Sequence, residues 1–169
     1  IGTIKMEVLR NEYPKNNFLQ KVKKLSVKYN KVLIFDECTT GFRESFGGIY
    51  KKYNVEPDIL ILGKALGNGY PITCVIGRDD IMKLKSKSFI SSTFWTDRIG
   101  PVAALETLKL MEKYKTWKKI TSIGKKIRGI WLENSERYKI PISIKGIPAL
   151  SNFSFSDKVN NLLYRSYLI

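Results

Sequence analysis

Short apolar runs and amphipathic stretches follow one another along the first half of the chain. Apolar and polar residues alternate in the first of these runs, whereas the later runs are continuous. Both patterns are typical of strands, and continuous runs bounded by polar residues favour strands buried in a covered sheet. Strands are therefore predicted at residues 1–8, 32–35, 59–62 and 72–76.

A helix is predicted between the first two strands. It begins with Asn16 or Asn17 as its N-cap and ends near Asn30. Its apolar stripe is expected to comprise Phe18, Val22, Leu25 and Tyr29. A strand, a helix and a second strand in this order predict a crossover unit, so the sheet is expected to be parallel in this region.

Helical periodicity dominates the second half of the chain. Helices are predicted at residues 100–114, 117–138 and 157–168, and short strands at 142–144 and 152–155. The buried stripe of the first helix is expected to contain Ala104, Leu105, Leu108 and Met111. That of the second is expected to contain Trp117, Ile120, Ile123, Ile127, Ile130 and Trp131. The break between these two helices predicts a boundary between a large α/β domain over residues 1–114 and the start of a smaller α+β domain over residues 115–169.

Two of the predicted strands each lead to one ionisable residue, and these two residues have opposite charges. Asp36 ends the run at residues 32–35, and Lys64 follows the run at residues 59–62 by one glycine. The carboxyl ends of neighbouring parallel strands meet at one edge of a sheet, where α/β proteins bind ligands. The pattern therefore predicts an acid and an amine side by side at this edge.

The charge of the chain changes the picture only slightly. The net charge is +15, and many of the basic residues lie between Lys109 and Arg128. Such an excess can indicate a nucleic-acid or anionic-membrane partner. The simpler interpretation is a solvated helix face, because the apolar residues of the same stretch follow a helical stripe.

The inventory of side chains excludes several kinds of site. The chain has no histidine, which excludes a Ser-His-Asp triad and a histidine-bound metal, and no metal site is predicted. Its two cysteines form neither a disulfide framework nor a metal-ligand spacing, so a reducing, cytoplasmic setting is the default expectation. No apolar run approaches the roughly 20 residues needed to cross a bilayer, and no membrane partner is expected.

Two segments of the strand-edge region resemble a known family. They are Asp-Glu-Cys-Thr-Thr-Gly-Phe-Arg at residues 36–43 and Gly-Lys-Ala-Leu-Gly-Asn-Gly-Tyr-Pro at residues 63–71. This pattern resembles the class III pyridoxal-phosphate-dependent aminotransferases, within them the glutamate-1-semialdehyde aminomutase-like branch. The resemblance covers nearly the whole chain, whereas the chain covers less than half of such an enzyme.

The resemblance implies the type I fold of pyridoxal-phosphate-dependent transferases. Residues 1–114 would be the C-terminal part of the large cofactor-binding domain, with a mainly parallel sheet, and residues 115–169 the beginning of the small α+β domain. Part of the phosphate site would lie upstream of Ile1, and the arginine that grips a substrate carboxylate would lie beyond Ile169. The 169-residue chain alone is therefore expected to be weakly active at best.

Lys64 and Asp36 are the catalytic residues that the resemblance implies. Lys64 would bind pyridoxal phosphate as a Schiff base and carry a proton during the reaction, because a neutral amine adds to an aldehyde. Asp36 would keep the ring nitrogen of the cofactor protonated, which the electron-sink chemistry requires. The alternatives are a surface lysine and an aspartate that caps a turn.

Four further residues receive weaker assignments from the resemblance. Cys38 would pack on one face of the cofactor ring, and Thr39 would hydrogen-bond its phenolic oxygen. Thr93, in Ser-Ser-Thr-Phe, would bind the cofactor phosphate of a neighbouring subunit, which implies a homodimer with shared active sites. Glu12 falls where some relatives keep a glutamate near the substrate. Core, turn or loop roles remain open for all four.

The sequence thus favours pyridoxal-phosphate-dependent amino-group transfer through Lys64. The substrates would be a small amino acid or amino-aldehyde and a keto acid. An aminotransferase and a glutamate-1-semialdehyde-type 2,1-aminomutase both remain open. The alternatives are an inactive truncated remnant of such an enzyme and, ranked last, a basic nucleic-acid-binding module.

Overall fold

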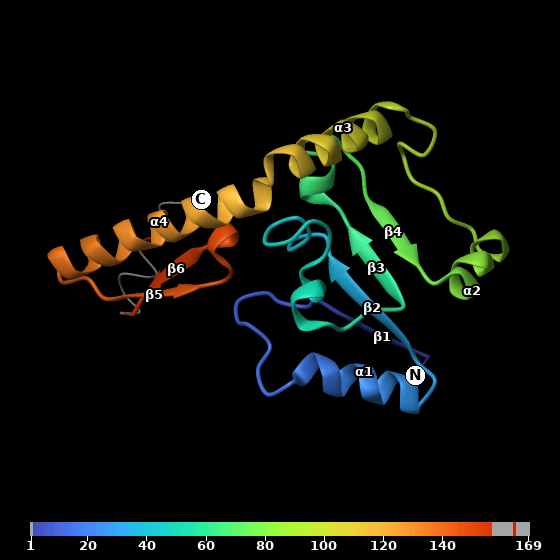
Figure 1. Ribbon diagram of the computed structural model, residues 1–169, viewed down its shortest axis with the longest axis horizontal. Coiled ribbons are helices and arrows are strands. Elements are labelled where there is room, and N and C mark those ends of the chain that lie inside the picture. Colours follow the sequence, from blue (N-terminus) through green and yellow to red (C-terminus); the bar gives the residue numbers. More distant parts are fainter. Residues whose placement is uncertain (1, 157–163, 165–169) are drawn as a thin grey trace.

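A four-stranded sheet forms the centre of the molecule in the computed structural model, which describes residues 2–156 and residue 164 (Figure 1). The strands lie in the order β1 (Thr3–Met6), β2 (Val32–Glu37), β3 (Ile59–Leu62) and β4 (Cys74–Gly77). β1, β2 and β3 are parallel, which confirms the predicted crossover unit, and β4 is antiparallel to β3. All four predicted strands of this sheet are present, with β1 and β4 shorter than expected.

Helices and a second, smaller sheet make up most of the remainder. The α-helices are α1 (Phe18–Lys28), α2 (Asp79–Met82), α3 (Ile99–Tyr114) and α4 (Thr116–Arg137). The 3-10 helices are η1 (Ile49–Tyr53), η2 (Lys64–Leu66), η3 (Lys83–Lys87) and η4 (Pro148–Leu150). β5 (Ile142–Lys145) and β6 (Asn152–Phe155) pair antiparallel, which confirms the two short strands predicted there. The helix predicted at residues 157–168 lies outside the described residues.

The elements divide into a sheet body and an extended arm. α1 lies on one side of the sheet, and α3 crosses the end at which β3 finishes (Figure 1). α4 continues away from the sheet, with β5, β6 and η4 along one side of it (Figure 1). None of the helices in the described part of the chain is long and apolar enough to span a membrane.

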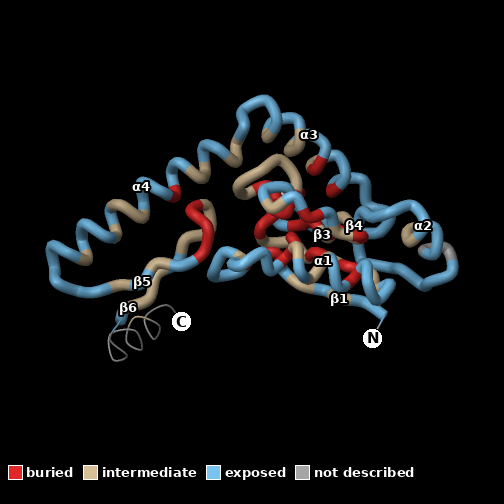
Figure 2. The backbone as a smooth tube through the Cα atoms, turned by 60° about the horizontal axis from the view of Figure 1, so that its bottom comes forward, coloured by how far each residue is buried: buried red, intermediate tan, exposed pale blue. Residues whose placement is uncertain are grey.

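The core lies on one face of the sheet. Alternate residues of β2 and β3 are buried, and Leu33 and Phe35 have no exposed surface. Their neighbours Val32 and Ile34 are only half-buried. The predicted burial of the strands is therefore complete on one face and partial on the other, and burial is concentrated in the sheet and the loops beside it (Figure 2).

α1 buries a different face from the one predicted. Leu19 and Ser26 are buried and Val22 is half-buried, which is one helical stripe. Phe18 and Leu25, assigned to the buried stripe by sequence, are about half exposed at 49% and 50%. Asn17 stands at the N-cap position, as predicted, but it has a left-handed conformation and its side chain makes no capping hydrogen bond.

α3 and α4 match their predicted ranges to within one residue and their predicted stripes in part. On α3, Ala104 is buried and Leu108 and Met111 are half-buried, as predicted, whereas Leu105 is exposed. On α4 the buried position is Gly124, and Trp117, Ile120 and Trp131 are half-buried. The other predicted positions on α4 are exposed: Ile123, Ile127 and Ile130. The lysines of this region are exposed, as the solvated-face interpretation predicts: Lys113, Lys115, Lys118, Lys119, Lys125 and Lys126.

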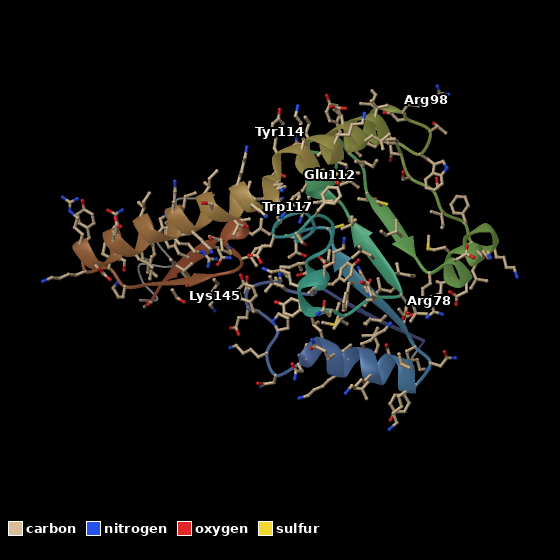
Figure 3. The ribbon with its side chains drawn as sticks, in the orientation of Figure 1. Arg78, Arg98, Glu112, Tyr114, Trp117 and Lys145 are labelled. Atoms are coloured by element: carbon tan, nitrogen blue, oxygen red, sulfur yellow. The ribbon has the colours of Figure 1, made fainter. Side chains whose placement is uncertain are left out.

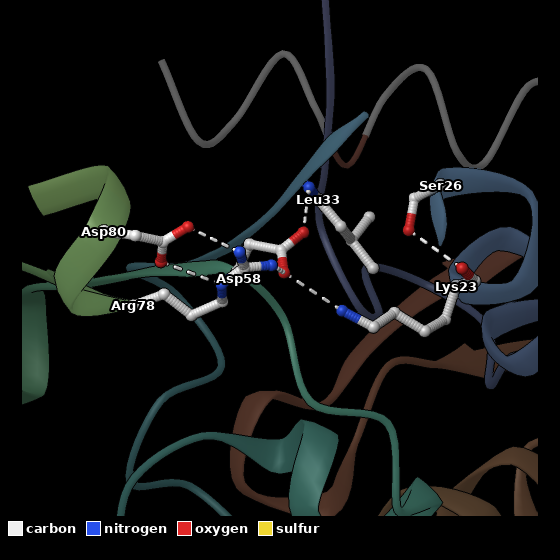
Figure 4. A network of polar contacts seen from close by, with 6 residues as sticks. All are labelled: Lys23, Ser26, Leu33, Asp58, Arg78 and Asp80. Carbon is white, nitrogen blue, oxygen red and sulfur yellow. Dashed lines mark hydrogen bonds and ion pairs between the residues drawn. The ribbon is translucent and has the colours of Figure 1, made fainter. Parts of the chain in front are cut away.

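Asp58, immediately before β3, links α1, β2 and the residue that follows β4, at the opposite end of β3 from Lys64 (Figure 4). Its carboxylate accepts a hydrogen bond of 2.8 Å from the Leu33 N–H, and it pairs with Lys23 at 3.2 Å and Arg78 at 2.9 Å. Arg78 also pairs with Asp80 at 2.6 Å. Burial alone would raise the pKa of Asp58, but the Leu33 N–H, Lys23 and Arg78 together lower it below the ordinary value.

Asp58→Asn is expected to destabilise the fold by about 1–3 kcal/mol, because two cations and an N–H lose their shared carboxylate. The effect depends on pH. Because the pKa of Asp58 is lowered by folding, its contribution is complete above the ordinary aspartate pKa of 3.8 and is lost as the pH falls through the lower folded value.

Thermal unfolding, followed by circular dichroism at several acidic pH values, measures how the contribution of Asp58 to stability depends on pH. The parent should lose more stability than Asp58→Asn as the pH falls below the ordinary aspartate pKa. Asp79→Asn is a matched control, since Asp79 is exposed and forms an ion pair along the same helix turn with Lys83. Parallel acid profiles for the parent and Asp58→Asn would contradict this account of Asp58.

Candidate functional site

Lys64 lies immediately beyond the C-terminal end of β3. Leu62 ends the strand, Gly63 is extended, and Lys64 begins η2 with a φ of 44°. A positive φ is uncommon for a residue with a side chain, and such residues are concentrated at functional sites. The Lys64 Nζ donates a hydrogen bond of 2.6 Å to the Thr39 Oγ1. The amine is thus held against the turn that follows β2.

Asp36 lies on the neighbouring parallel strand. It pairs in register with Ile61 of β3, three residues before Lys64. One carboxylate oxygen accepts the Cys38 N–H at 3.2 Å, and the other pairs with the Lys5 Nζ at 3.0 Å. The hydrogen bond from Lys5 is the main cause that lowers the pKa of Asp36. The structure therefore places an ionised acid and an amine at the same sheet edge, as predicted.

Lys5 is the member of this cluster that sequence reasoning missed. It lies on β1 opposite Ile34 and diagonally across from Asp36. The ion pair with Asp36 raises the pKa of Lys5. The polar position of Lys5 in an alternating strand was visible in the sequence, but the register that brings it to Asp36 was not.

Glu37 holds the turn that carries Cys38 and Thr39. Its side chain has no exposed surface and points to the face opposite Asp36. It accepts hydrogen bonds from the Ile49 N–H at 2.7 Å, the Tyr50 N–H at 2.9 Å and the Thr40 hydroxyl at 3.0 Å. Burial is the main cause that raises the pKa of Glu37. Its role in this structure is to fix the loop beside the site.

Gly63 lets the two strand ends approach each other. A Cβ atom on Gly63 would lie 3.1 Å from the Cys38 Sγ and 3.3 Å from a methyl carbon of Thr73. Burial is the main cause that raises the pKa of the Cys38 thiol, and the charge of Lys64 opposes it. The bare backbone at residue 63 therefore keeps Cys38 close to Lys64.

A cavity of about 450 Å³ opens beside Lys64. On the sheet side it is lined by Phe42, Arg43 and Lys64, and across from them by Leu110 and Met111 of α3 and Ile120 of α4. The start of α4 lies next to the loop that follows β2, where Trp117 packs on Phe46 with ring centroids 5.6 Å apart (Figure 3). An amine, a guanidinium and an apolar wall therefore share one cavity.

The candidate residues divide into those that lie together and those that do not. Asp36, Cys38, Thr39 and Lys64 form one cluster through the contacts given above. Thr93 lies in the exposed loop before α3 and does not line the cavity of Lys64. Glu12 is exposed and pairs with Lys15 at 3.5 Å. The roles assigned to all of these residues remain predictions.

Comparison with known proteins gives a consistent family match. A family model described as Aminotransferase class-III matches residues 11–167. The chain is 34% identical over 145 residues to a 3-aminobutyryl-CoA aminotransferase of Cloacimonas acidaminovorans, covering 85% of this chain and 35% of that protein. It is 34% identical over 150 residues to a glutamate-1-semialdehyde 2,1-aminomutase of Methanococcus vannielii, which covers 86% of this chain and 34% of that protein.

Solved structures show the same fold. The FumI protein of Sphingopyxis sp. MTA144, in its PLP internal aldimine form, has a TM-score of 0.86 at 22% identity, over 92% of this chain and 39% of that one. An ornithine aminotransferase from Plasmodium yoelii has a TM-score of 0.81 at 27% identity, over 96% of this chain and 45% of that one. The chain thus spans about a third of the length of the sequence relatives given above.

Proposed function

Because the chain belongs to the class-III aminotransferase family, we propose that it contributes to pyridoxal-phosphate-dependent amino-group transfer. The observation that carries the proposal is the pairing of the Lys64 amine with the Thr39 hydroxyl at 2.6 Å, on the same sheet edge as the ionised Asp36. The reaction would be that of an aminotransferase or of a 2,1-aminomutase. The family match does not favour an inactive remnant or a nucleic-acid-binding module.

The residues at the strand edge fit pyridoxal phosphate. Lys64 offers an amine for the aldehyde, and Asp36 offers a carboxylate that Lys5 keeps ionised, which suits a protonated ring nitrogen. Thr39 offers a hydroxyl next to the amine. Gly63 carries no Cβ atom, which lets the side chain of Cys38 pack closely against the residue that precedes Lys64.

The chemistry divides between the cofactor and the side chains. Pyridoxal phosphate, when bound, supplies the electron sink that stabilises negative charge on the substrate carbon. Lys64 Nζ would hold the cofactor through its aldehyde and, once released, move a proton at that carbon. Asp36 would hold the proton on the ring nitrogen. The apolar wall from α3 and α4 would exclude water from the reacting atoms.

Titration of the 169-residue chain with pyridoxal phosphate tests this proposal. We expect a saturable absorbance band at the near-visible edge when the cofactor aldehyde bonds to a lysine amine. Asp36→Asn should weaken this binding, because the ring nitrogen loses its anion, whereas Asp79→Asn should bind like the parent. A chain that develops no saturable band would overturn the proposal.

A homodimer belongs to the same proposal. The face formed by α3 and the preceding loop is rich in exposed apolar side chains, such as Trp95, Val102 and Leu105. A groove of about 510 Å³ runs along this face. Apolar surface of this kind is typical of an interface, and a second copy would bring its own Thr93 loop to the cofactor phosphate.

Analytical ultracentrifugation checks the dimer. Val102→Asp is expected to shift the chain from dimer to monomer, since a charge would be buried in the interface. Leu132→Asp on exposed α4 is the control and should leave the dimer intact. A parent chain that is monomeric at all concentrations would contradict the dimer.

The domain boundary and the cellular setting complete the proposal. We place the boundary between residues 1–114 and 115–169, and two features support it. α3 ends at Tyr114 and α4 begins at Thr116, with Lys115 between them at a φ of 49°. The β5–β6 sheet is separate from the main sheet. Cys38 and Cys74 are free thiols, which suits a reducing cytoplasmic location.

A further inference from the structure

Arg43 lies on the same cavity as Lys64, and the proposed reaction does not yet use it. Arg43 belongs to the turn that follows β2, and it lines the cavity together with Lys64. Arg43 is half-buried. Its Nε donates a hydrogen bond of 3.4 Å to the Thr39 carbonyl, and its own carbonyl accepts the Thr121 hydroxyl at 3.2 Å. The backbone of Arg43 is thus anchored from α4 and its side chain from the Thr39 turn.

The guanidinium of Arg43 has no acid to balance it within the described part of the chain. The nearby carboxylates are already engaged: Asp36 with Lys5, Glu37 with the backbone of η1, and Glu44 with Lys52. Burial lowers the pKa of Arg43, and no acid opposes this shift. A half-buried cation without a counter-charge costs free energy, which an anion from outside the chain would recover.

Thr39 fixes the position of Arg43 relative to Lys64. The hydroxyl of Thr39 accepts the Lys64 amine at 2.6 Å, and its carbonyl accepts the Arg43 Nε. The side chains of Lys64 and Arg43 are therefore both hydrogen-bonded to Thr39, which lies between them. A small molecule with its reacting amine or carbonyl carbon at Lys64 would have its neighbouring groups within reach of Arg43. The opposite wall of the cavity is mainly apolar, with Leu110, Met111 and Ile120.

We propose that Arg43 binds a carboxylate of the substrate and so selects substrates that carry one. This inference rests on the proposed function, and it concerns a different arginine from the one that the family resemblance places beyond Ile169. The planar guanidinium offers paired N–H donors that match a carboxylate, which a lysine amine does not. The substrate class is an amino or keto compound with a carboxylate close to the reacting carbon.

Titration of the cofactor-free 169-residue chain tests the proposal independently of Lys64 chemistry. The probe is succinate, and uncharged succinamide is the matched control ligand. Nitrogen NMR of arginine Nε–H groups reports binding at Arg43 directly, with the signal assigned by its loss in Arg43→Gln. We expect succinate, but not succinamide, to shift the Arg43 signal, and Arg43→Gln to bind succinate at least about tenfold more weakly.

Two further variants separate the role of Arg43 from general charge and from folding. Arg43→Lys keeps the charge without the paired donors and should restore only part of the affinity. Arg137→Gln removes an exposed guanidinium at the end of α4 and should bind succinate like the parent. Circular dichroism identifies an unfolded variant, and Arg43→Gln is used to assign the signal only if it folds like the parent.

Several outcomes would overturn the role of Arg43. One is equal succinate affinity in the parent and Arg43→Gln. Another is an Arg43 signal that moves with inorganic phosphate but not with succinate, which would assign the guanidinium to a phosphate group instead. Failure of the proposed function looks different, since it is the absence of a pyridoxal-phosphate band in the separate absorbance titration.

Discussion

Lys64→Ala should abolish the near-visible band that pyridoxal phosphate forms with the parent chain. It should also slow amino transfer in a single-turnover measurement by about 10²–10⁴-fold, the range expected when a positioned proton carrier is removed. The reason is that the Lys64 amine is the group held at the strand edge beside Asp36, with its Nζ 2.6 Å from the Thr39 hydroxyl. Alanine can neither bond to the aldehyde nor carry the proton.

The control for Lys64→Ala must account for the many other amines of this basic chain. Lys126→Ala removes an exposed amine on α4, outside the cavity, and should retain both the band and the rate. Lys64→Arg keeps the positive charge but offers no amine that adds to an aldehyde, so it should behave like Lys64→Ala. A band of undiminished strength in Lys64→Ala would show that another lysine binds the cofactor.

Gly124→Ala is expected to cause the largest loss of stability, about 3 kcal/mol or more. Gly124 is the buried position of α4, and it lies against η4. A Cβ atom there would lie 1.9 Å from the Pro148 carbonyl oxygen and 2.4 Å from its carbon. Both atoms belong to the backbone, so no side-chain rotation relieves the clash and the helix must move away from η4.

A second glycine in the same helix provides the matched control. Gly129 has no atom within 4 Å of the position of an added Cβ. Gly129→Ala should therefore stabilise the chain by about 0.5–1 kcal/mol through helix propensity alone. Thermal melts should show Gly124→Ala lower by roughly 6–12 °C and Gly129→Ala slightly higher. Equal melting temperatures for the two variants would mean that α4 does not pack on η4 as closely as described.

The elements of the fold were largely predictable, because short apolar runs and helical periodicity are local signals. The run at residues 59–62 became β3 without a change of boundary, and the antiparallel pair β5–β6 lies where its residues predict it. The strand-edge cluster was predictable for a related reason. Asp36 and Lys64 follow neighbouring parallel strands, and parallel strands end at a common edge.

Other features depend on contacts between distant segments, which a local pattern does not contain. Both Leu19 and Leu25 are apolar positions on α1, and only packing against the sheet decides that the first is buried and the second is not. Lys5 reaches Asp36 because of the register of β1 against β2. In the sequence, Arg43 is only one residue of a family motif. Its lack of a counter-charge among the described residues became visible only from the positions of its neighbours.

The most direct test is to locate the covalent bond between the chain and the cofactor. The parent chain is mixed with an equimolar amount of pyridoxal phosphate, reduced with borohydride, digested and mapped by mass spectrometry. We expect the cofactor on the peptide that contains Lys64, and its loss from that peptide in Lys64→Ala. A cofactor scattered over the surface lysines, or fixed on another single lysine, would contradict the assignment of the site to the edge shared by β2 and β3.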